Sequence, residues 1–165
     1  EQLIAKAKLS DDTKVIIAPH DLNPDHIDLI KNLFPKSQLY SEFVLAESSN
    51  VLILNTMGML KFAYQYGDMA FVGGAFGKGL HNILEPMAYG LPVIFGPNHD
   101  KFPEALAAME AGIAKQINTR SELETAINYF QNAKSNYKSE VRDWLDSRIV
   151  DVDEMHAKIL QDAVH

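Results

Sequence analysis

The sequence predicts an α/β fold with a doubly wound parallel sheet in a single domain. Short apolar runs, typical of buried strands, alternate along the chain with longer amphipathic segments, typical of helices. Glycine or polar residues follow most of the apolar runs, at the points where strands of such a sheet end beside a ligand. The chain has 165 residues, which is enough for one domain with its own hydrophobic core.

The expected strands are short and rich in residues that favour β structure. Each is bounded by proline, glycine or polar turn residues. Because helical segments separate them, we expect the strands to lie parallel in one sheet. Their expected ranges are Val15–Pro19, Gln38–Tyr40, Val51–Leu54, Met69–Val72, Val93–Phe95 and Ala114–Ile117.

The expected helices begin at a proline or a capping side chain. Pro24 and Pro103 suit a first helical turn because proline lacks an N–H and has a fixed φ. Asn55-Thr56 is expected to cap a helix that stops at Gly67. The expected ranges are Pro24–Phe34, Asn55–Ala63, Asn82–Tyr89 and Pro103–Ala111, with a last helix that begins at Thr119 or Ser121 and runs through Ala133.

The ends of the chain are expected to differ from its middle. Residues 1–12 have the character of a linker or the end of a helix, so we expect a piece of a longer protein. Residues 13–133 form the expected α/β core. Residues 134–165 are expected to be helical, with a break near Asp146–Val150.

Composition excludes several classes of protein. The net charge of −7 argues against general affinity for nucleic acid, which needs an excess of Lys and Arg. Cysteine is absent, which excludes disulfides and thiolate metal sites. The six histidines form no H-x-x-x-H pair, so we expect no metal site and no cofactor.

A glycine-rich loop after the fourth expected strand is the strongest candidate for a binding site. Gly73 and Gly74 allow the backbone to approach a ligand closely, and Lys78 adds a mobile positive charge. His81 and Glu85 lie where this loop becomes a helix, whose first N–H groups attract anions. The pattern therefore predicts a phosphate or nucleotide ligand, although it is neither a Walker motif nor a dinucleotide fingerprint.

A purely structural interpretation of the same residues stays open. Asn82 and Glu85 also have the spacing of a capping box, and Lys78 could be an ordinary solvated charge. Polar clusters at the ends of several expected strands favour the binding site over this alternative, because the carboxyl ends of parallel strands meet at one edge. These clusters are His20-Asp21, Tyr40-Ser41-Glu42, Asn55-Thr56, Gly73–Glu85 and Gly96–Lys101.

Three motifs resemble one known family. They are G-G-A-F-G-K-G-L-H-N-I-L-E-P from Gly73, G-L-P-V-I-F-G-P from Gly90, and N-T-M-G-M-L from Asn55. Together with Ala18-Pro19-His20, they resemble the C-terminal half of bacterial 3-deoxy-D-manno-octulosonic acid (Kdo) transferase. The resemblance covers about Val15 to Tyr129.

The resemblance implies the Rossmann-like, C-terminal half of a GT-B glycosyltransferase. This half would bind the donor CMP-Kdo, and the whole enzyme would transfer Kdo to a lipid A precursor at the cytoplasmic face of the bacterial inner membrane. The general base would belong to the N-terminal half, so this chain alone is expected to be inactive. The candidate substrate-binding residues are His20, Thr56, Met57, Gly58, Gly73, Gly74, Lys78, His81, Asn82 and Glu85.

The sequence departs from the family pattern at several positions. His20 stands where the family often has a phosphate-binding Arg, and Asn55 and Met59 replace acidic residues. Lys101 replaces an Asn. Two alternatives therefore stay open: the donor domain of another GT-B enzyme that uses a UDP-sugar (a transferase or an epimerase), and a non-catalytic α/β module that binds a phosphorylated ligand.

Overall fold

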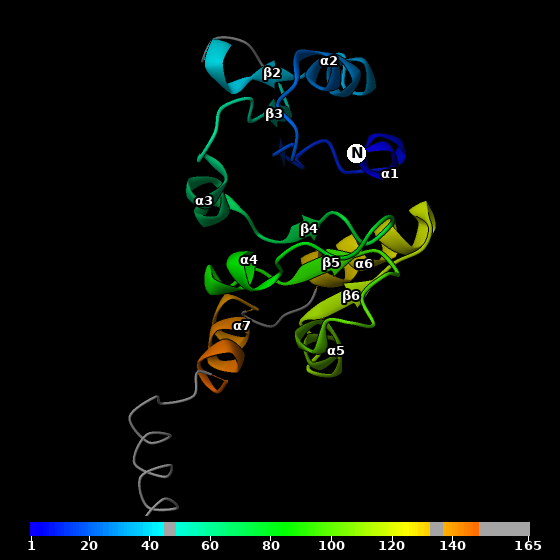
Figure 1. Cartoon of the computed structure of the whole chain (residues 1–165), viewed down its shortest axis with the longest axis vertical. Helices are drawn as coiled ribbons and strands as arrows, with labels where there is room; N and C mark the ends of the chain where they lie inside the picture. The colour runs from blue at the N-terminus through cyan, green and yellow to red at the C-terminus, as the bar shows by residue number, and fades with distance from the viewer. Residues whose placement is uncertain (45–48, 133–136, 149–165) are drawn as a thin grey trace, which may run out of the picture.

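The fold is seen in a computed structural model, which describes residues 1–44, 49–132 and 137–148 (Figure 1). Parallel strands and helices alternate along these residues, so the predicted α/β class is confirmed. Most of the tail expected to be helical, residues 149–165, lies outside the described residues. The last helix of the described residues ends at Asp146, where the break near Asp146–Val150 is expected to begin, and the last two residues of that break lie outside the described residues.

The strands form two parallel sheets, so the expectation of one continuous sheet is wrong for the described residues. The first sheet has the order β1-β3-β2 and the second the order β4-β5-β6. Every strand pair in both sheets is parallel. The strands are β1 (Val15–Ile17), β2 (Gln38–Leu39), β3 (Val51–Ile53), β4 (Ala70–Val72), β5 (Val93–Phe95) and β6 (Ala114–Gln116).

Helices connect the strands at nearly the expected places. Those that begin at Pro24 and Pro103 start where the sequence predicts, and Asn23 caps the first of them by accepting from the Asp25 N–H at 3.0 Å. The helices are α1 (Gln2–Lys6), α2 (Pro24–Leu33), α3 (Leu60–Ala63), α4 (Leu84–Ala88), α5 (Pro103–Glu110), α6 (Arg120–Asn132) and α7 (Tyr137–Asp146), with 3-10 turns η1 (Tyr40–Glu42) and η2 (Tyr64–Tyr66).

The helix expected to be capped by Asn55-Thr56 begins later than predicted. It starts at Leu60, and no side chain caps it. The Asn55 side chain instead accepts from the Ser41 N–H at 3.1 Å and donates to the Ser41 hydroxyl at 2.8 Å. Gly58, with φ of +78°, turns the chain between the strand and this helix. A contact distant in sequence therefore replaces the expected local cap.

The larger core surrounds the second sheet on both faces. Val93 and Phe95 of β5 are fully buried in a cluster with residues of α4, α5 and α7. Between them, Ile94 points the other way, into a cluster formed with α6 and α1. This alternation places helices on both faces of the sheet, which is the doubly wound arrangement that the sequence predicts.

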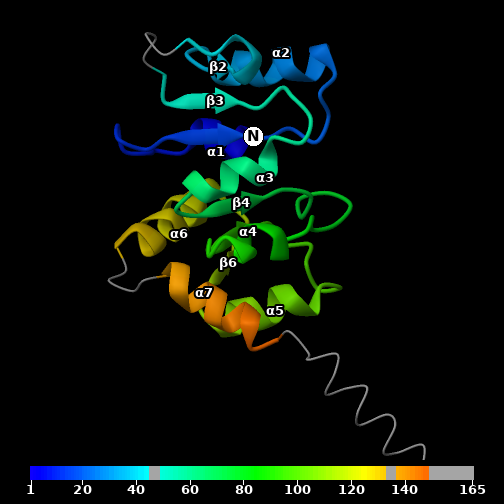
Figure 2. The same ribbon diagram turned by 90° about the vertical axis from the view of Figure 1, so that its left-hand side faces the viewer.

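The first sheet has a smaller core of its own. Ile17 and Ile53 pack with Ile27 and Ile30 of α2, so α2 covers one face of this sheet. In Figures 1 and 2 the strands follow the order β2, β3, β1 and then β4, with β1 between β3 and β4. Among the described residues, no helix is long and apolar enough to cross a membrane.

Candidate functional site

The glycine-rich loop begins directly after β4 and folds back on itself. The Gly74 carbonyl accepts from the N–H groups of Gly77 at 2.8 Å and Gly79 at 3.4 Å. The Gly73 carbonyl accepts from the His81 N–H at 3.1 Å. These bonds make a compact loop whose two ends meet at the carboxyl end of β4.

Gly74 is a position in this loop where a side chain would not fit. Its φ is +88°, a conformation that other residues rarely adopt. A β-carbon at Gly74 would lie 2.2 Å from the Gly79 carbonyl oxygen and 2.5 Å from Cδ2 of His81. The absence of a side chain therefore lets His81 pack directly against the backbone of the loop.

Asn98, in the loop after β5, holds the glycine-rich loop in place. Its side-chain N–H donates to the Gly77 carbonyl at 2.9 Å, and its backbone N–H donates to the Ala75 carbonyl at 2.8 Å. Sequence reasoning included Asn98 only as part of a polar cluster. Its anchoring role depends on the pairing of β4 with β5, which no local pattern reveals.

His20 and His81 come together from different sheets. His20 follows β1 and His81 follows the glycine-rich loop, and their ring centroids are 5.4 Å apart at an interplanar angle of 43°. Both side chains are exposed. Two imidazoles side by side can each donate an N–H to an anion.

Asn82 and Glu85 do not form the capping box that their spacing allows. Helix α4 begins at Leu84, so the expected start at Asn82 is wrong. Asn82 Oδ1 accepts from the Leu84 N–H at 2.9 Å, a local turn that precedes the helix. Glu85 lies in the first helical turn with its carboxylate exposed, where it is available to a ligand.

Tyr64 is a neighbour of Glu85 that sequence reasoning missed. Burial is the largest cause of a rise in the pKa of Tyr64 to about 12, and the nearby Glu85 carboxylate and Tyr89 contribute to the same rise. The ring of Tyr64 lies 5.7 Å from that of Tyr89. Tyr64 comes from η2, so the segment after β3 reaches α4, and no sequence motif marks this contact.

The raised pKa of Tyr64 predicts a loss of stability at alkaline pH. An unfolded tyrosine loses its proton near pH 10, whereas folded Tyr64 keeps it until about pH 12. Its contribution to the free energy of unfolding is therefore complete below about pH 10 and disappears as the pH rises to about 12. Thermal melting across this range should fall more steeply for the parent chain than for Tyr64→Phe.

A second variant tests the raised pKa of Tyr64 by another measurement. Glu85→Gln removes the negative charge beside Tyr64, so the phenol should titrate at a lower pH, as followed by the tyrosine ring signals in NMR. Equal pH dependence of melting in the parent and Tyr64→Phe would contradict a raised pKa.

The other candidate residues are exposed around this centre. Thr56, Met57 and Gly58 form the turn after β3, and the Met57 side chain is 83% exposed. Lys78 is exposed in the glycine-rich loop. Within the part of the chain that the structure describes, no hydrogen bond joins these residues to His81 or Glu85.

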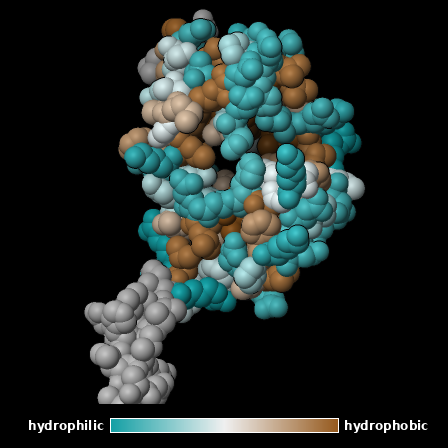
Figure 3. All heavy atoms as spheres, viewed as in Figure 1, coloured by the Kyte–Doolittle hydropathy of each residue, from teal (hydrophilic) through white to brown (hydrophobic). Residues whose placement is uncertain are grey.

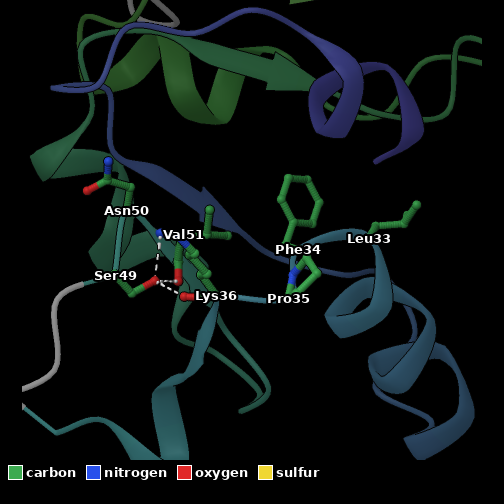
Figure 4. A pocket seen from close by; sticks show the side chains of 7 residues that line it. All are labelled: Leu33, Phe34, Pro35, Lys36, Ser49, Asn50 and Val51. Atoms are coloured by element: carbon green, nitrogen blue, oxygen red, sulfur yellow. Dashed lines mark hydrogen bonds between the residues drawn. The ribbon is translucent and has the colours of Figure 1, made fainter.

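A pocket of about 570 Å³ lies away from these residues (Figure 4). Lys36 precedes β2 and Val51 begins β3, so the pocket is at the amino ends of these strands. Its Ser49 Oγ already lies 2.5 Å from the Lys36 carbonyl and 2.9 Å from the Val51 carbonyl. The pocket is lined by Leu33, Phe34, Pro35, Lys36, Ser49, Asn50 and Val51.

The described residues contain no group of three His, Asp or Glu side chains that could hold a metal ion. The candidate residues at the carboxyl ends of β1, β3 and β4 offer backbone N–H groups, two imidazoles, an amide and a carboxylate. Such a set can bind phosphate and hydroxyl groups.

Comparison with known proteins identifies relatives of the chain. No protein-family model matches it. It is 33% identical over 130 residues to 3-deoxy-D-manno-octulosonic acid transferase of Chlamydia trachomatis serovar D, covering 74% of this chain and 30% of that protein. The chain is homologous to the Kdo transferases. The predicted resemblance is thereby confirmed.

A second Kdo transferase gives the same result. The protein of Aquifex aeolicus is 32% identical over 124 residues, covering 72% of this chain and 35% of that protein. The chain thus spans about a third of the length of the Kdo transferases that it matches.

A solved structure supports the fold. It is the C-terminal CMP-Kdo binding domain of WaaA from Acinetobacter baumannii, with a TM-score of 0.63 at 16% sequence identity. The match covers 83% of this chain and 89% of that domain. At this identity the likeness concerns the fold alone.

Proposed function

We propose that this chain is the donor-binding domain of a glycosyltransferase and binds CMP-Kdo. The observation that carries the proposal is the packing of His81 against Gly74, which exposes loop backbone and an imidazole at the carboxyl end of β4. A donor phosphate suits this place because backbone N–H groups and imidazoles are hydrogen-bond donors. Homology to Kdo transferases supports CMP-Kdo as the donor.

Each candidate residue has a role in this proposal. The loop at Gly73 and Gly74, with His81 and His20, contacts the donor phosphates, and Lys78 adds positive charge at the rim. Asn82 and Glu85 contact the ribose, since a carboxylate accepts hydrogen bonds from two adjacent hydroxyls well. The turn Thr56–Gly58 lines the nucleotide side.

The activity belongs to a longer protein in this proposal. That protein transfers Kdo to a lipid A precursor at the cytoplasmic face of the inner membrane, as part of lipopolysaccharide biosynthesis. The acceptor site and the general base lie in an N-terminal domain, and neither a metal nor a cofactor takes part. The chain spans only about a third of its relatives' length, so these features concern residues outside it.

Calorimetric titration with CMP, UMP and UDP tests the proposed function. The chain should bind CMP, and Glu85→Gln should weaken this binding by about tenfold or more, because a hydrogen bond to a charged group contributes about 1.5–3 kcal/mol. Thermal melting should remain close to that of the parent, since no hydrogen bond from the Glu85 side chain is found among the described residues.

A matched control is Glu140→Gln. Glu140 is also an exposed carboxylate in the first turn of a helix, α7, so its replacement should leave CMP binding unchanged. A clear preference for UDP over CMP would indicate the donor domain of another GT-B enzyme. Unchanged CMP affinity in Glu85→Gln, with a lower melting temperature, would leave Glu85 a structural residue only.

A further inference from the structure

The loop after β5 touches the glycine-rich loop at three points. Asn98 contacts it through both its backbone and its side chain. The ring of Phe76 packs against Gly96, where an added β-carbon would lie 2.6 Å from the ring. The ring of Phe102 packs against Gly79, where an added β-carbon would lie 3.6 Å from the ring. The loop after β5 therefore supports the middle of the glycine-rich loop.

His99 holds the loop after β5 in shape. Its side chain is buried, and its ring lies 5.2 Å from that of Phe95. Its Nδ1 lies 3.3 Å from the Gly96 carbonyl oxygen, and its own carbonyl accepts from the Phe102 N–H at 2.9 Å. These contacts tie both ends of the loop to His99. The adjacent Asn98 is thus presented by a backbone that is held on both sides.

Asn98 fixes two peptide groups of the glycine-rich loop through their carbonyls. The Ala75 carbonyl accepts from the Asn98 backbone N–H at 2.8 Å, and the Gly77 carbonyl accepts from the Asn98 side chain at 2.9 Å. A peptide group is planar, and none of those described is cis, so its C=O and its N–H point in opposite directions. The N–H groups of these two peptide groups belong to Phe76 and Lys78. Both therefore point away from the carbonyl contacts with Asn98.

The N–H groups of Phe76 and Lys78 have no hydrogen-bond acceptor among the described residues. In contrast, the N–H groups of Gly77 and Gly79 both donate to the Gly74 carbonyl. Phe76 and Lys78 are also exposed residues. Backbone N–H groups of a turn that the protein leaves without acceptors are typical of anion-binding loops.

The glycine-rich loop and the two histidines lie at one end of the sheets. Figure 2 shows the loop (green) extending beyond the end of β4. The His81 ring packs against Gly74 of the loop, and the His20 ring is 5.4 Å from that of His81. The face drawn in Figure 3 is hollowed between the two sheets, and hydrophilic side chains surround much of the hollow. Such a surface suits a charged ligand better than an apolar one.

We propose that Asn98 is a positioning residue that directs the N–H groups of Phe76 and Lys78 toward the phosphate of the nucleotide donor. The phosphate accepts from these two N–H groups in addition to the contacts proposed above for His20 and His81. The inference rests on the proposed function and adds to it two donors and the residue that orients them. Because Asn98 acts through the loop, its effect is confined to the part of the ligand that the loop binds.

Amide NMR spectra of the isotope-labelled chain test the inference without any variant. CMP should shift the Phe76 and Lys78 amide protons to lower field, whereas cytidine, which lacks the phosphate, should leave them nearly unchanged. The Gly77 and Gly79 amides are internal controls and should shift less, because their N–H groups already donate within the loop. The same comparison of UDP with uridine covers a chain that prefers the other nucleotide.

Asn98→Ala removes the side-chain support of Gly77 and keeps the backbone contact. Its affinity for CMP should fall about three- to tenfold, the effect of one neutral hydrogen bond, while its affinity for cytidine stays that of the parent. The shifts to lower field should shrink as well. Asn118→Ala is the matched control and should bind CMP as the parent does. Asn118 is an exposed asparagine that follows the neighbouring strand β6, and its side chain donates to the Glu122 carboxylate at 3.3 Å.

The other outcomes separate this inference from the proposed function. Equal losses of CMP and cytidine affinity in Asn98→Ala would give Asn98 a structural role only and would overturn the inference. Nucleotide binding that moves neither the Phe76 nor the Lys78 amide would also overturn it, and the proposed function would then stand without these two donors. Failure of both nucleotides to bind would contradict the proposed function and the inference together.

Discussion

Replacing Gly74 with alanine is expected to weaken CMP binding by at least about tenfold. The new β-carbon would lie 2.2 Å from the Gly79 carbonyl oxygen and 2.5 Å from Cδ2 of His81, so the loop or His81 has to move. The left-handed backbone at φ of +88° adds about 1–2 kcal/mol of strain. Both effects displace the groups proposed to contact the donor phosphate, as calorimetry with CMP would measure.

Gly112→Ala is a control that introduces backbone strain without displacing the glycine-rich loop or His81. Gly112 has φ of +76°, close to that of Gly74, but nothing lies within 4 Å of its added β-carbon. It follows α5, away from the glycine-rich loop. This variant should lose about 2–4 °C in melting temperature per 1 kcal/mol of strain and should bind CMP as the parent does. Equal CMP affinity in both variants would exclude the proposed role of the loop.

The sequence was sufficient where local chemistry decides the structure. The strand Val93–Phe95 has its predicted bounds because three apolar residues follow a proline and precede a glycine. Pro24 and Pro103 begin their helices because proline fixes φ and needs no partner for an N–H. The same local signals located the glycine-rich loop between β4 and α4.

The sequence predicted helix caps poorly because an asparagine side chain can form other hydrogen bonds. The Asn55 side chain bonds Ser41, which is fourteen residues away, and Asn82 forms a turn before the helix and not a cap. These choices depend on which groups the fold brings near. A spacing rule in the sequence has no access to that information.

Contacts between helices, strands and loops could not be predicted from the sequence for the same reason. The edge of the sheet at which His20 and His81 meet was expected, whereas Tyr64 beside Glu85 and Asn98 against the loop were not. The division into two sheets was also missed, since the alternation of strands and helices does not reveal which strands are neighbours.

The 165-residue chain alone is expected to transfer no sugar from CMP-Kdo to a lipid A precursor. Its candidate residues are proposed to contact the donor, and the one carboxylate among them, Glu85, is assigned to the ribose. Transfer also needs a bound acceptor and a base to deprotonate the acceptor hydroxyl. The net charge of −7 gives the chain no attraction to an anionic membrane that carries a lipid acceptor.

Linking the chain to an N-terminal acceptor domain is expected to produce activity. Holding donor and acceptor in one cleft removes an entropic cost that can amount to about 7–11 kcal/mol of the barrier. The assay compares product formation by the 165-residue chain, by the longer protein, and by the longer protein carrying Glu85→Gln. The variant should show a raised KM for CMP-Kdo, because the carboxylate is assigned to donor binding and not to proton transfer.

The comparison distinguishes the two assignments of the general base. If the base lies in the N-terminal domain, the isolated chain is inactive however much CMP-Kdo is supplied. In the longer protein, a higher donor concentration then restores the activity that Glu85→Gln loses. If Glu85 were the base, kcat would fall at saturating donor and no concentration would restore it. Turnover by the isolated chain approaching that of the longer protein would place both the base and the acceptor site within residues 1–165, and the proposed division between the two domains would be wrong.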